Sequence, residues 1–372
     1  MTASLHETSA ELHNGASVAA RTAALAARPA SVDARPARRR AVRIAGIAGC
    51  VLALVAASAA SLVFGVRDVP LNEVWQALAG PQDVAREGMN AAATLSRVPT
   101  TVAGILVGAA LGIGGALMQG VTRNPLADPG LLGINSGAAL FVVFGMTFLG
   151  VGSAIGTVWF AFAGAAAAAL VVYAVASTGR RGATPLGLTL AGAAVTAAAS
   201  SLTLGVLLTH VDSLDSYRFW QIGSISAPSW PTIALLTPFI VVGAVLALLQ
   251  GPALNALALG DDLARGLGHR VGLSRMLAAI AVVLLCGAAT AMAGPIAFVG
   301  LAVPHAARLI FGADYRWVLP ASALLGGVLL LVADVIGRLV ARPSTIEVGV
   351  VVAVIGAPVL IALVRRTKAA AL

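Results

Sequence analysis

Apolar runs of about twenty residues, separated by short polar segments, recur along most of the chain. A helix of about this length crosses the roughly 30 Å of hydrocarbon in a bilayer. We therefore predict an all-α membrane protein with about ten transmembrane helices. They lie near residues 44–66, 98–119, 130–148, 154–176, 184–208, 232–250, 274–294, 296–311, 317–336 and 346–364.

The order of these predicted helices contains a further pattern. With ten spans, the second and the seventh cross the membrane in opposite directions, and each begins a set of four spans that carry small residues. This pattern indicates a weak inverted repeat. In transporters, such repeats place the substrate route at the interface between them.

Composition excludes a soluble fold and a nucleic-acid partner. The chain is 59% hydrophobic and only 10% charged, whereas about 25% of the residues of an ordinary soluble domain are charged. A net charge of +9 would suit phosphate binding, but the basic residues lie mainly at the ends of apolar runs, where they fix helix orientation. The expected surroundings are membrane lipid, with no nucleic acid.

The two ends of the chain are polar or basic. Residues 1–43 lack apolar periodicity and predict a disordered N-terminal tail, followed by a transmembrane domain at 44–366 and a short tail at 367–372. A cleaved signal peptide ending near Ala57-Ser58-Ala59 is the alternative, although the first apolar run is longer than usual for one. The excess of Lys and Arg on one side predicts that both termini are cytoplasmic, in the inner membrane.

The chain has no ATP-binding motif. A P-loop needs a Gly-Lys-Ser/Thr sequence, and the single lysine, Lys368, stands between Thr367 and Ala369. If transport is driven by ATP, another chain must hydrolyse it. An ion-gradient-driven secondary transporter is the alternative, but such carriers usually place ionisable groups deep in their spans, and Asp128, His305, Asp334 and Glu347 lie at or near span ends.

A membrane-embedded enzyme is the third hypothesis. The spans contain no paired carboxylates, metal cluster or activated nucleophile at membrane depth. Cys50 and Cys286 lie within apolar runs, where a thiol behaves as a small hydrophobic group. We therefore expect no catalytic residue, no metal ligand and no cofactor.

Two polar segments on the predicted cytoplasmic side stand out. Residues 119–130 contain Pro125 and Pro129, which forbid a continuous helix and predict a turn. Residues 253–268 predict two short helices joined at Gly260, either projecting as a docking knob for a partner or lying on the membrane surface. On the outer side, Asp334 and Arg338 have the i, i+4 spacing of a helical ion pair.

These segments together resemble the permease family of ABC importers for iron–siderophore complexes, haem and cobalamin, over residues 44–366. The two most specific matches are Arg123-Asn124-Pro125-Leu126-Ala127-Asp128-Pro129 with Leu132-Gly133, and Gly294-Pro295-Ile296-Ala297-Phe298-Val299-Gly300-Leu301 with Pro304-His305 and Arg308. Weaker matches are Trp220-Gln221-Ile222-Gly223-Ser224, Leu319-Pro320 and Gly356-Ala357-Pro358.

The resemblance implies a ten-helix protomer that pairs with a second permease copy, identical or related, around a central pathway. It also implies an ATP-binding subunit dimer below and an extracytoplasmic substrate-binding protein above. The expected cargo is a metal chelate such as a ferric siderophore, with haem or cobalamin as alternatives.

The resemblance also assigns roles to individual residues. The ATPase-coupling loop would include Leu257, Gly260, Asp261, Asp262, Arg265 and Gly268. The inner gate would lie near Asn124, Pro125 and Thr184. Binding-protein docking would use Arg97 and Arg338.

Three positions depart from the family pattern. Thr100 stands where a second arginine is common, Thr345 where a glutamate is usual, and Glu347 where a proline is usual. All three are expected on the outer face. They therefore bear on the docking contacts more than on the fold.

Overall fold

The computed structural model describes residues 34–79, 88–178, 184–210, 212–226 and 228–369. The chain divides into two units, Met1–Ala45 and Gly46–Leu372. The described part of the first unit is the start of helix α2 (Ala34–Val63). Most of the predicted disordered tail lies outside the described residues, but the prediction is wrong for 34–43, which are helical. This stretch is rich in Ala and Arg, both strong helix formers.

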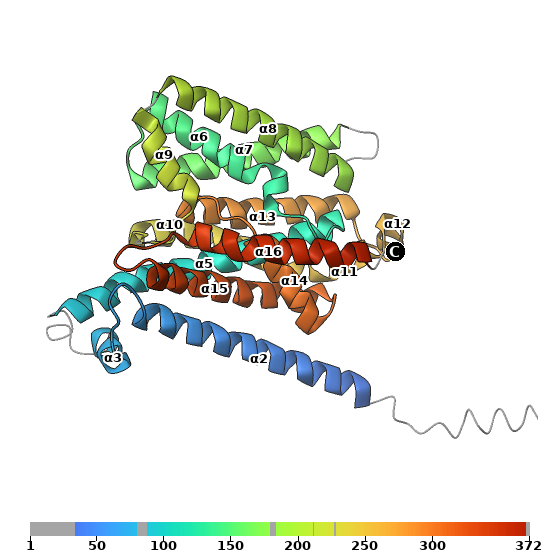
Figure 1. The fold of residues 1–372 in the computed structure, drawn as a ribbon. Helices are drawn as coiled ribbons and strands as arrows, with labels where there is room; N and C mark the ends of the chain where they lie inside the picture. Colours follow the sequence, from blue (N-terminus) through green and yellow to red (C-terminus); the bar gives the residue numbers. More distant parts are fainter. Residues whose placement is uncertain (1–33, 80–87, 179–183, 211, 227, 370–372) are drawn as a thin grey trace, which may run out of the picture. The chain divides into compact units, whose positions relative to one another are not determined.

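Within the described residues, seven helices are long and apolar enough to cross a membrane. They are α2, α5 (Met89–Thr122), α7 (Ala154–Ser177), α8 (Pro185–Thr209), α10 (Trp230–Leu249), α13 (Val271–Ala293) and α15 (Tyr315–Val340). The remaining predicted spans correspond to shorter apolar helices, α6 (Ile134–Phe148), α14 (Val299–Phe311) and the start of α16 (Val348–Ala369). The predicted all-α membrane fold is therefore confirmed (Figure 1).

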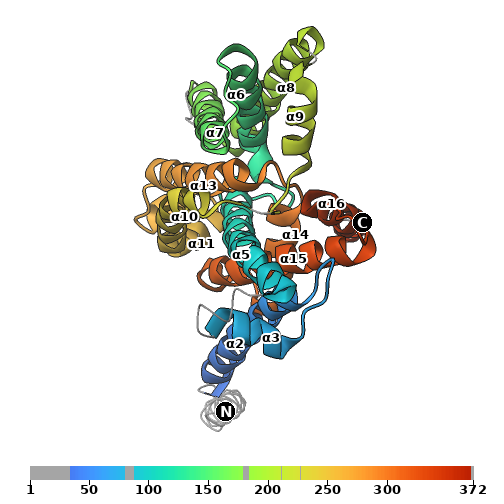
Figure 2. The ribbon, with the colours of Figure 1, turned by 90° about the vertical axis from the view of Figure 1, so that its left-hand side faces the viewer.

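Helix α5 runs through the centre of the second unit, between α13, α14 and α15 (Figure 2). Its small residues allow the neighbouring backbones to approach closely. A Cβ atom on Gly115 would lie 1.9 Å from the carbonyl oxygen of Gly300, and one on Gly108 would lie 2.3 Å from that of Gly326. Gly108 and Gly115 are thus points of close contact between α5 and its neighbours.

Two short connections run back into the helix bundle. After α5, the chain forms the 3₁₀ turn η1 (Pro129–Leu132), whose Pro129 packs so closely on α14 that a Cβ on Gly300 would lie 2.9 Å from its Cδ atom. Between α13 and α14 the chain is non-helical, and Phe298 adopts a left-handed φ of 68°. The helices that follow these connections, α6 and α14, have 15 and 13 residues.

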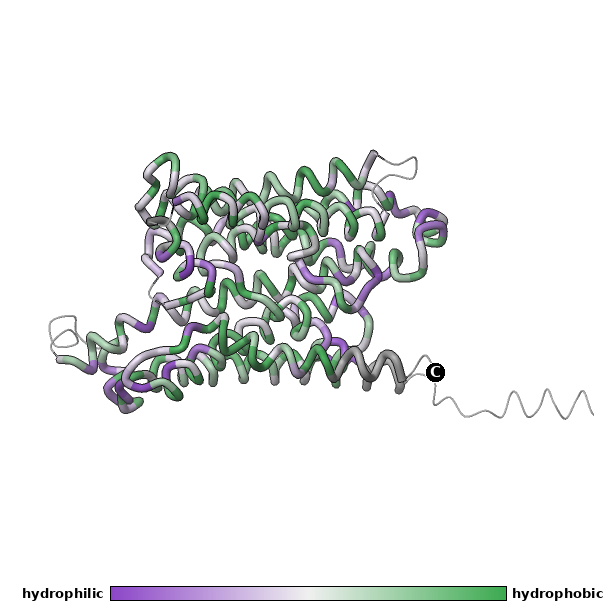
Figure 3. The backbone as a smooth tube through the Cα atoms, turned by 45° about the horizontal axis from the view of Figure 1, so that its top comes forward, coloured by the Kyte–Doolittle hydropathy of each residue, from purple (hydrophilic) through white to green (hydrophobic). Residues whose placement is uncertain are grey.

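Four short helices in the described residues lie between the spans: α3 (Leu71–Ala79), α9 (Asp212–Ile222) and the pair α11 (Gly251–Ala258) and α12 (Asp261–Gly266). Figure 3 shows apolar residues along most of the long helices, with hydrophilic residues concentrated near their ends. The polar chemistry of this chain is therefore mainly at the two ends of the bundle.

Candidate coupling and docking sites

The α11–α12 pair has the predicted helix–glycine–helix form. Gly260 joins the two helices at a φ of 111°, a conformation that an L-residue rarely adopts. Leu254 and Leu257 of α11 are each only 1% exposed, and α11 packs on α5 and α15. The apolar face of α11 thus packs against the protein, which favours the projecting unit over a helix lying on the membrane.

Three leucines of this unit are exposed to solvent, and no role was predicted for them. Leu259, Leu263 and Leu267 are 60%, 60% and 63% exposed. They follow one another at intervals of four residues, with Leu259 at the C-terminal end of α11, Leu263 within α12 and Leu267 at the C-terminal end of α12. This four-residue spacing is visible in the sequence and could have indicated these leucines as a group. Gly268, which ends the segment, also has a positive φ, of 84°.

Asp261 is held by two arginines from distant parts of the chain. Its Oδ1 atom lies 2.8 Å from Nη2 of Arg123 and 2.9 Å from Nη2 of Arg275. Arg123 caps the C-terminus of α5 at a left-handed φ of 53°, and Arg275 is buried in the first turns of α13. Sequence reasoning assigned no role to these two arginines.

The neighbouring acidic residue has a different environment. Among the described residues, Asp262 forms an ion pair with Arg265, three residues later on the same short helix, at 2.8 Å. The Asp262 side chain is 99% exposed, whereas that of Asp261 is 25% exposed. Of the two adjacent carboxylates, only Asp261 connects α12 to the bundle.

The structure brings part of the predicted gate close to this unit. Thr184 caps α8 by accepting a hydrogen bond from the Gly187 amide at 3.1 Å. A cavity of about 980 Å³ lies between this end of α8 and the α11–α12 pair. Its lining residues are Arg123, Thr184, Pro185, Leu259, Gly260, Asp261, Asp262, Leu263 and Arg265.

Asn124 and Pro125 form the turn that directly follows Arg123. The Asn124 side chain accepts a hydrogen bond from the Leu126 amide at 3.0 Å, and its carbonyl accepts one from Ala127 at 3.1 Å. Both residues are exposed, and neither lines the cavity. They are connected to the coupling unit through Arg123.

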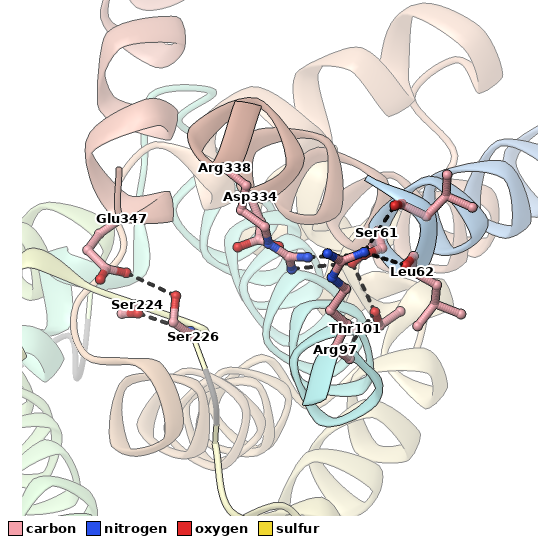
Figure 4. Close-up of polar contacts among 10 residues, drawn as sticks. Ser61, Leu62, Arg97, Thr101, Ser224, Ser226, Asp334, Arg338 and Glu347 are labelled. Carbon is pink, nitrogen blue, oxygen red and sulfur yellow. Dashed lines mark hydrogen bonds and ion pairs between the residues drawn. The ribbon is translucent and has the colours of Figure 1, made fainter. Parts of the chain in front are cut away.

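At the opposite end of the bundle, which is predicted to face outward and is called the outer end below, Arg97 lies inside the protein. It is 8% exposed, and its guanidinium group donates a hydrogen bond to the Leu62 carbonyl at 2.8 Å (Figure 4). It also donates to the carbonyl of Val63 at 3.0 Å and to that of Arg67. These are carbonyls at and just beyond the C-terminus of α2, where the helix itself supplies no donors.

Arg338 is also 8% exposed and completes the same cluster. It pairs with Asp334, which confirms the predicted i, i+4 contact, and it donates to the Ser61 carbonyl at 3.0 Å. The Ser61 hydroxyl in turn lies 2.9 Å from that of Thr101 (Figure 4). The docking role of Arg97 and Arg338 stays a prediction, and both arginines already bond to internal partners.

Another ion pair, which is exposed, is formed by residues that are close in sequence to this buried cluster. Arg342 pairs with Asp68 in the segment between α2 and α3. The hydrogen bond from the Arg342 guanidinium lowers the pKa of the Asp68 carboxyl. Glu347, one of the unusual outer residues, accepts a hydrogen bond from the Ser226 hydroxyl at 3.3 Å (Figure 4).

Known proteins resemble this chain along most of its length. The chain is 46% identical to the ferric enterobactin transport system permease protein FepD of Escherichia coli, over 87% of this chain and 96% of that protein. It is 42% identical to a probable siderophore transport system permease protein, YfiZ of Bacillus subtilis, over 85% of this chain and 94% of the relative.

The fold resembles a solved structure as well. A metal-chelate type ABC transporter in an inward-facing conformation matches with a TM-score of 0.74 and 25% identity, over 87% of this chain and 99% of that one. The family model of the FecCD transport family matches residues 52–366. From the matched span and these identities, the chain belongs to the FecCD transport family.

Proposed function

We propose that this chain is the membrane-spanning permease subunit of an ABC importer that brings a ferric-siderophore-type chelate into the cytoplasm. The observation that carries the proposal is the 46% identity to a ferric enterobactin permease over nearly its whole length. Relatives named for haemin and cobalamin transport are 36% and 38% identical over shorter stretches. They support haem or cobalamin as second candidates.

The chain needs partners to act in this way. It has no P-loop, so ATP hydrolysis belongs to a separate ATP-binding subunit dimer. We assign that subunit to the α11–α12 pair, because Leu259, Leu263 and Leu267 expose apolar surface on a short polar connection. A second permease copy would complete the pathway, and an extracytoplasmic binding protein would deliver the chelate. Both termini would then face the cytoplasm.

Uptake by the assembled transporter tests the cargo. The permease is reconstituted in proteoliposomes with an ATP-binding subunit and a binding protein, and uptake of ferric enterobactin, haemin and cobalamin is compared. We expect ferric-siderophore uptake that requires ATP and is blocked by vanadate. Uptake that requires only a proton gradient would overturn the ABC proposal, and preferred uptake of haemin or cobalamin would reassign the cargo.

Co-purification in detergent tests the coupling surface. We expect Leu263→Asp to lower recovery of the ATP-binding subunit while the permease stays folded, because the side chain already faces solvent. Gly260→Pro should also lower it, since proline cannot adopt the positive φ at this position. Leu126→Asp, in the separate turn after α5, is the matched control. Equal recovery from all variants would contradict this assignment.

A further inference from the structure

The arrangement around Asp261 has a consequence beyond the docking of the ATP-binding subunit. The α11–α12 pair is short, and Gly260 between its helices has no side chain to pack. A Cβ atom added there would lie 3.9 Å from Nη1 of Arg123, so the arginine passes close over the glycine. The pair is joined to the bundle through α11, by its packing and by the hydrogen bonds of Asn255 with Asp314 and with the Tyr315 amide at 2.7 and 2.9 Å. It is joined through α12 by the two ion pairs of Asp261.

Those ion pairs connect α12 to α5 and α13. Arg123 directly follows α5 as its C-terminal cap, and α5 packs on α13, α14 and α15. Arg275 belongs to α13, which itself packs on α5, α7 and α10. A single carboxylate oxygen therefore connects α12 to both helices.

The same contacts border the cytoplasmic cavity. Arg123 and Asp261 form one side of it, and Thr184 and Pro185 at the start of α8 form another. The residue after Arg123 is Asn124, which begins the turn leading to η1. A shift of α12 would therefore be passed to the end of α5, to this turn and to the cavity wall.

We propose that Asp261 is a positioning residue that transmits movement of the α11–α12 pair to α5 and α13 through Arg123 and Arg275. This inference rests on the proposed function, because the movement would come from the ATP-binding subunit. Removing the Asp261 charge leaves two guanidinium groups close together with no anion between them, so they repel and the link opens. In the described part of the chain, Asp262 pairs with Arg265 of its own helix, so it should not transmit this movement.

The test compares the two neighbouring carboxylates in the complete transporter. Asp261→Asn and Asp262→Asn are each purified with the ATP-binding subunit, and both uptake and ATP hydrolysis are measured. Site-to-site coupling in proteins typically changes an equilibrium by 5- to 150-fold. We expect Asp261→Asn to lower uptake per ATP hydrolysed by about tenfold, with normal recovery of the ATP-binding subunit. Asp262→Asn, in the same docking unit, should keep the wild-type ratio of uptake to ATP hydrolysed, whatever its effect on recovery of the ATP-binding subunit.

Two further variants distinguish transmission from simple loss of structure. Asp261→Glu keeps the charge and should restore most of the uptake per ATP. Arg123→Gln should lower it as Asp261→Asn does, and the double variant Arg123→Gln/Asp261→Asn should be no worse than either single variant, as expected for one shared contact.

Several results would overturn the proposal. Equal effects of Asp261→Asn and Asp262→Asn would show that the link to Arg123 and Arg275 is irrelevant. Additive effects of Arg123→Gln and Asp261→Asn would show that the two residues act separately. Loss of the ATP-binding subunit from Asp261→Asn would assign Asp261 to docking. Failure of the wild-type complex to transport or to bind the subunit would instead refute the proposed function.

Discussion

The chain has an arginine cluster at each end of the bundle, and the two clusters differ in what the arginines bind. At the inner end, Arg123 and Arg275 share one carboxylate of a short projecting helix. At the outer end, Arg97 and Arg338 bind mostly backbone carbonyls at the end of α2, together with the buried Asp334. In the inner cluster Arg123 and Asp261 are partly exposed and only Arg275 is buried, whereas both outer arginines are buried.

This difference separates two uses of the same side chain. Carbonyls at a helix end lack intrahelical donors, so a buried arginine that satisfies them stabilises the fold. An exposed or half-exposed ion pair contributes little to stability. The outer cluster should therefore matter most for folding, and the inner cluster for coupling.

Arg338→Met should have the largest effect on stability. It leaves the Asp334 carboxylate buried without its cation and removes the donor to the Ser61 carbonyl. Loss of one partner of a buried ion pair typically costs about 3–5 kcal/mol. Thermal unfolding in detergent, followed by size-exclusion chromatography, measures it. The double variant Asp334→Leu/Arg338→Met should recover part of the loss, and no recovery would show that the carbonyl contacts dominate.

Arg97→Gln should have an intermediate effect. The glutamine is too short to reach the carbonyls of Leu62, Val63 and Arg67 together. Each hydrogen bond to a charged group contributes about 1.5–3 kcal/mol. We expect a lower unfolding temperature than for the wild type but a higher one than for Arg338→Met. Thermal unfolding in detergent measures both temperatures. Arg218→Gln, at an exposed arginine of α9, is the control.

A second variant at this position, Arg97→Glu, tests docking of the binding protein. If Arg97 meets the binding protein, the folded fraction of Arg97→Glu should bind it more weakly, and the defect should be larger at low salt because salt screens the contact. Surface plasmon resonance at two ionic strengths measures this. A defect that is equal at both ionic strengths would assign Arg97 to folding alone.

Arg342→Gln should have the smallest effect. Its ion pair with Asp68 is exposed, so the unfolding temperature should stay within error of the wild type. Because Arg342 lowers the pKa of Asp68 in the folded protein, any contribution is present above the ordinary carboxyl pKa and is lost as the pH falls through the lowered value. A large drop in the unfolding temperature at neutral pH would contradict the conclusion that this exposed ion pair contributes little to stability.

The sequence by itself determined the apolar runs, the absence of a P-loop and the family. Run length and charge placement depend only on the order of residues, because every transmembrane helix must satisfy its own backbone and match the bilayer thickness. The Asp334–Arg338 pair was also predictable, since residues four apart share a helix face. The Gly260 break was predictable for a similar local reason.

Only the tertiary structure decided which charged groups are held and which are free to face solvent. Asp261 and Asp262 are identical neighbours in the sequence, yet α5 and α13 bring arginines to the first and leave the second exposed. The sequence predicts Arg97 as a charge on the outer surface, but the end of α2 packs over it and supplies its carbonyl partners. These partners are 35, 138 and 14 residues away along the chain, and local sequence periodicity carries no information on contacts between separate helices.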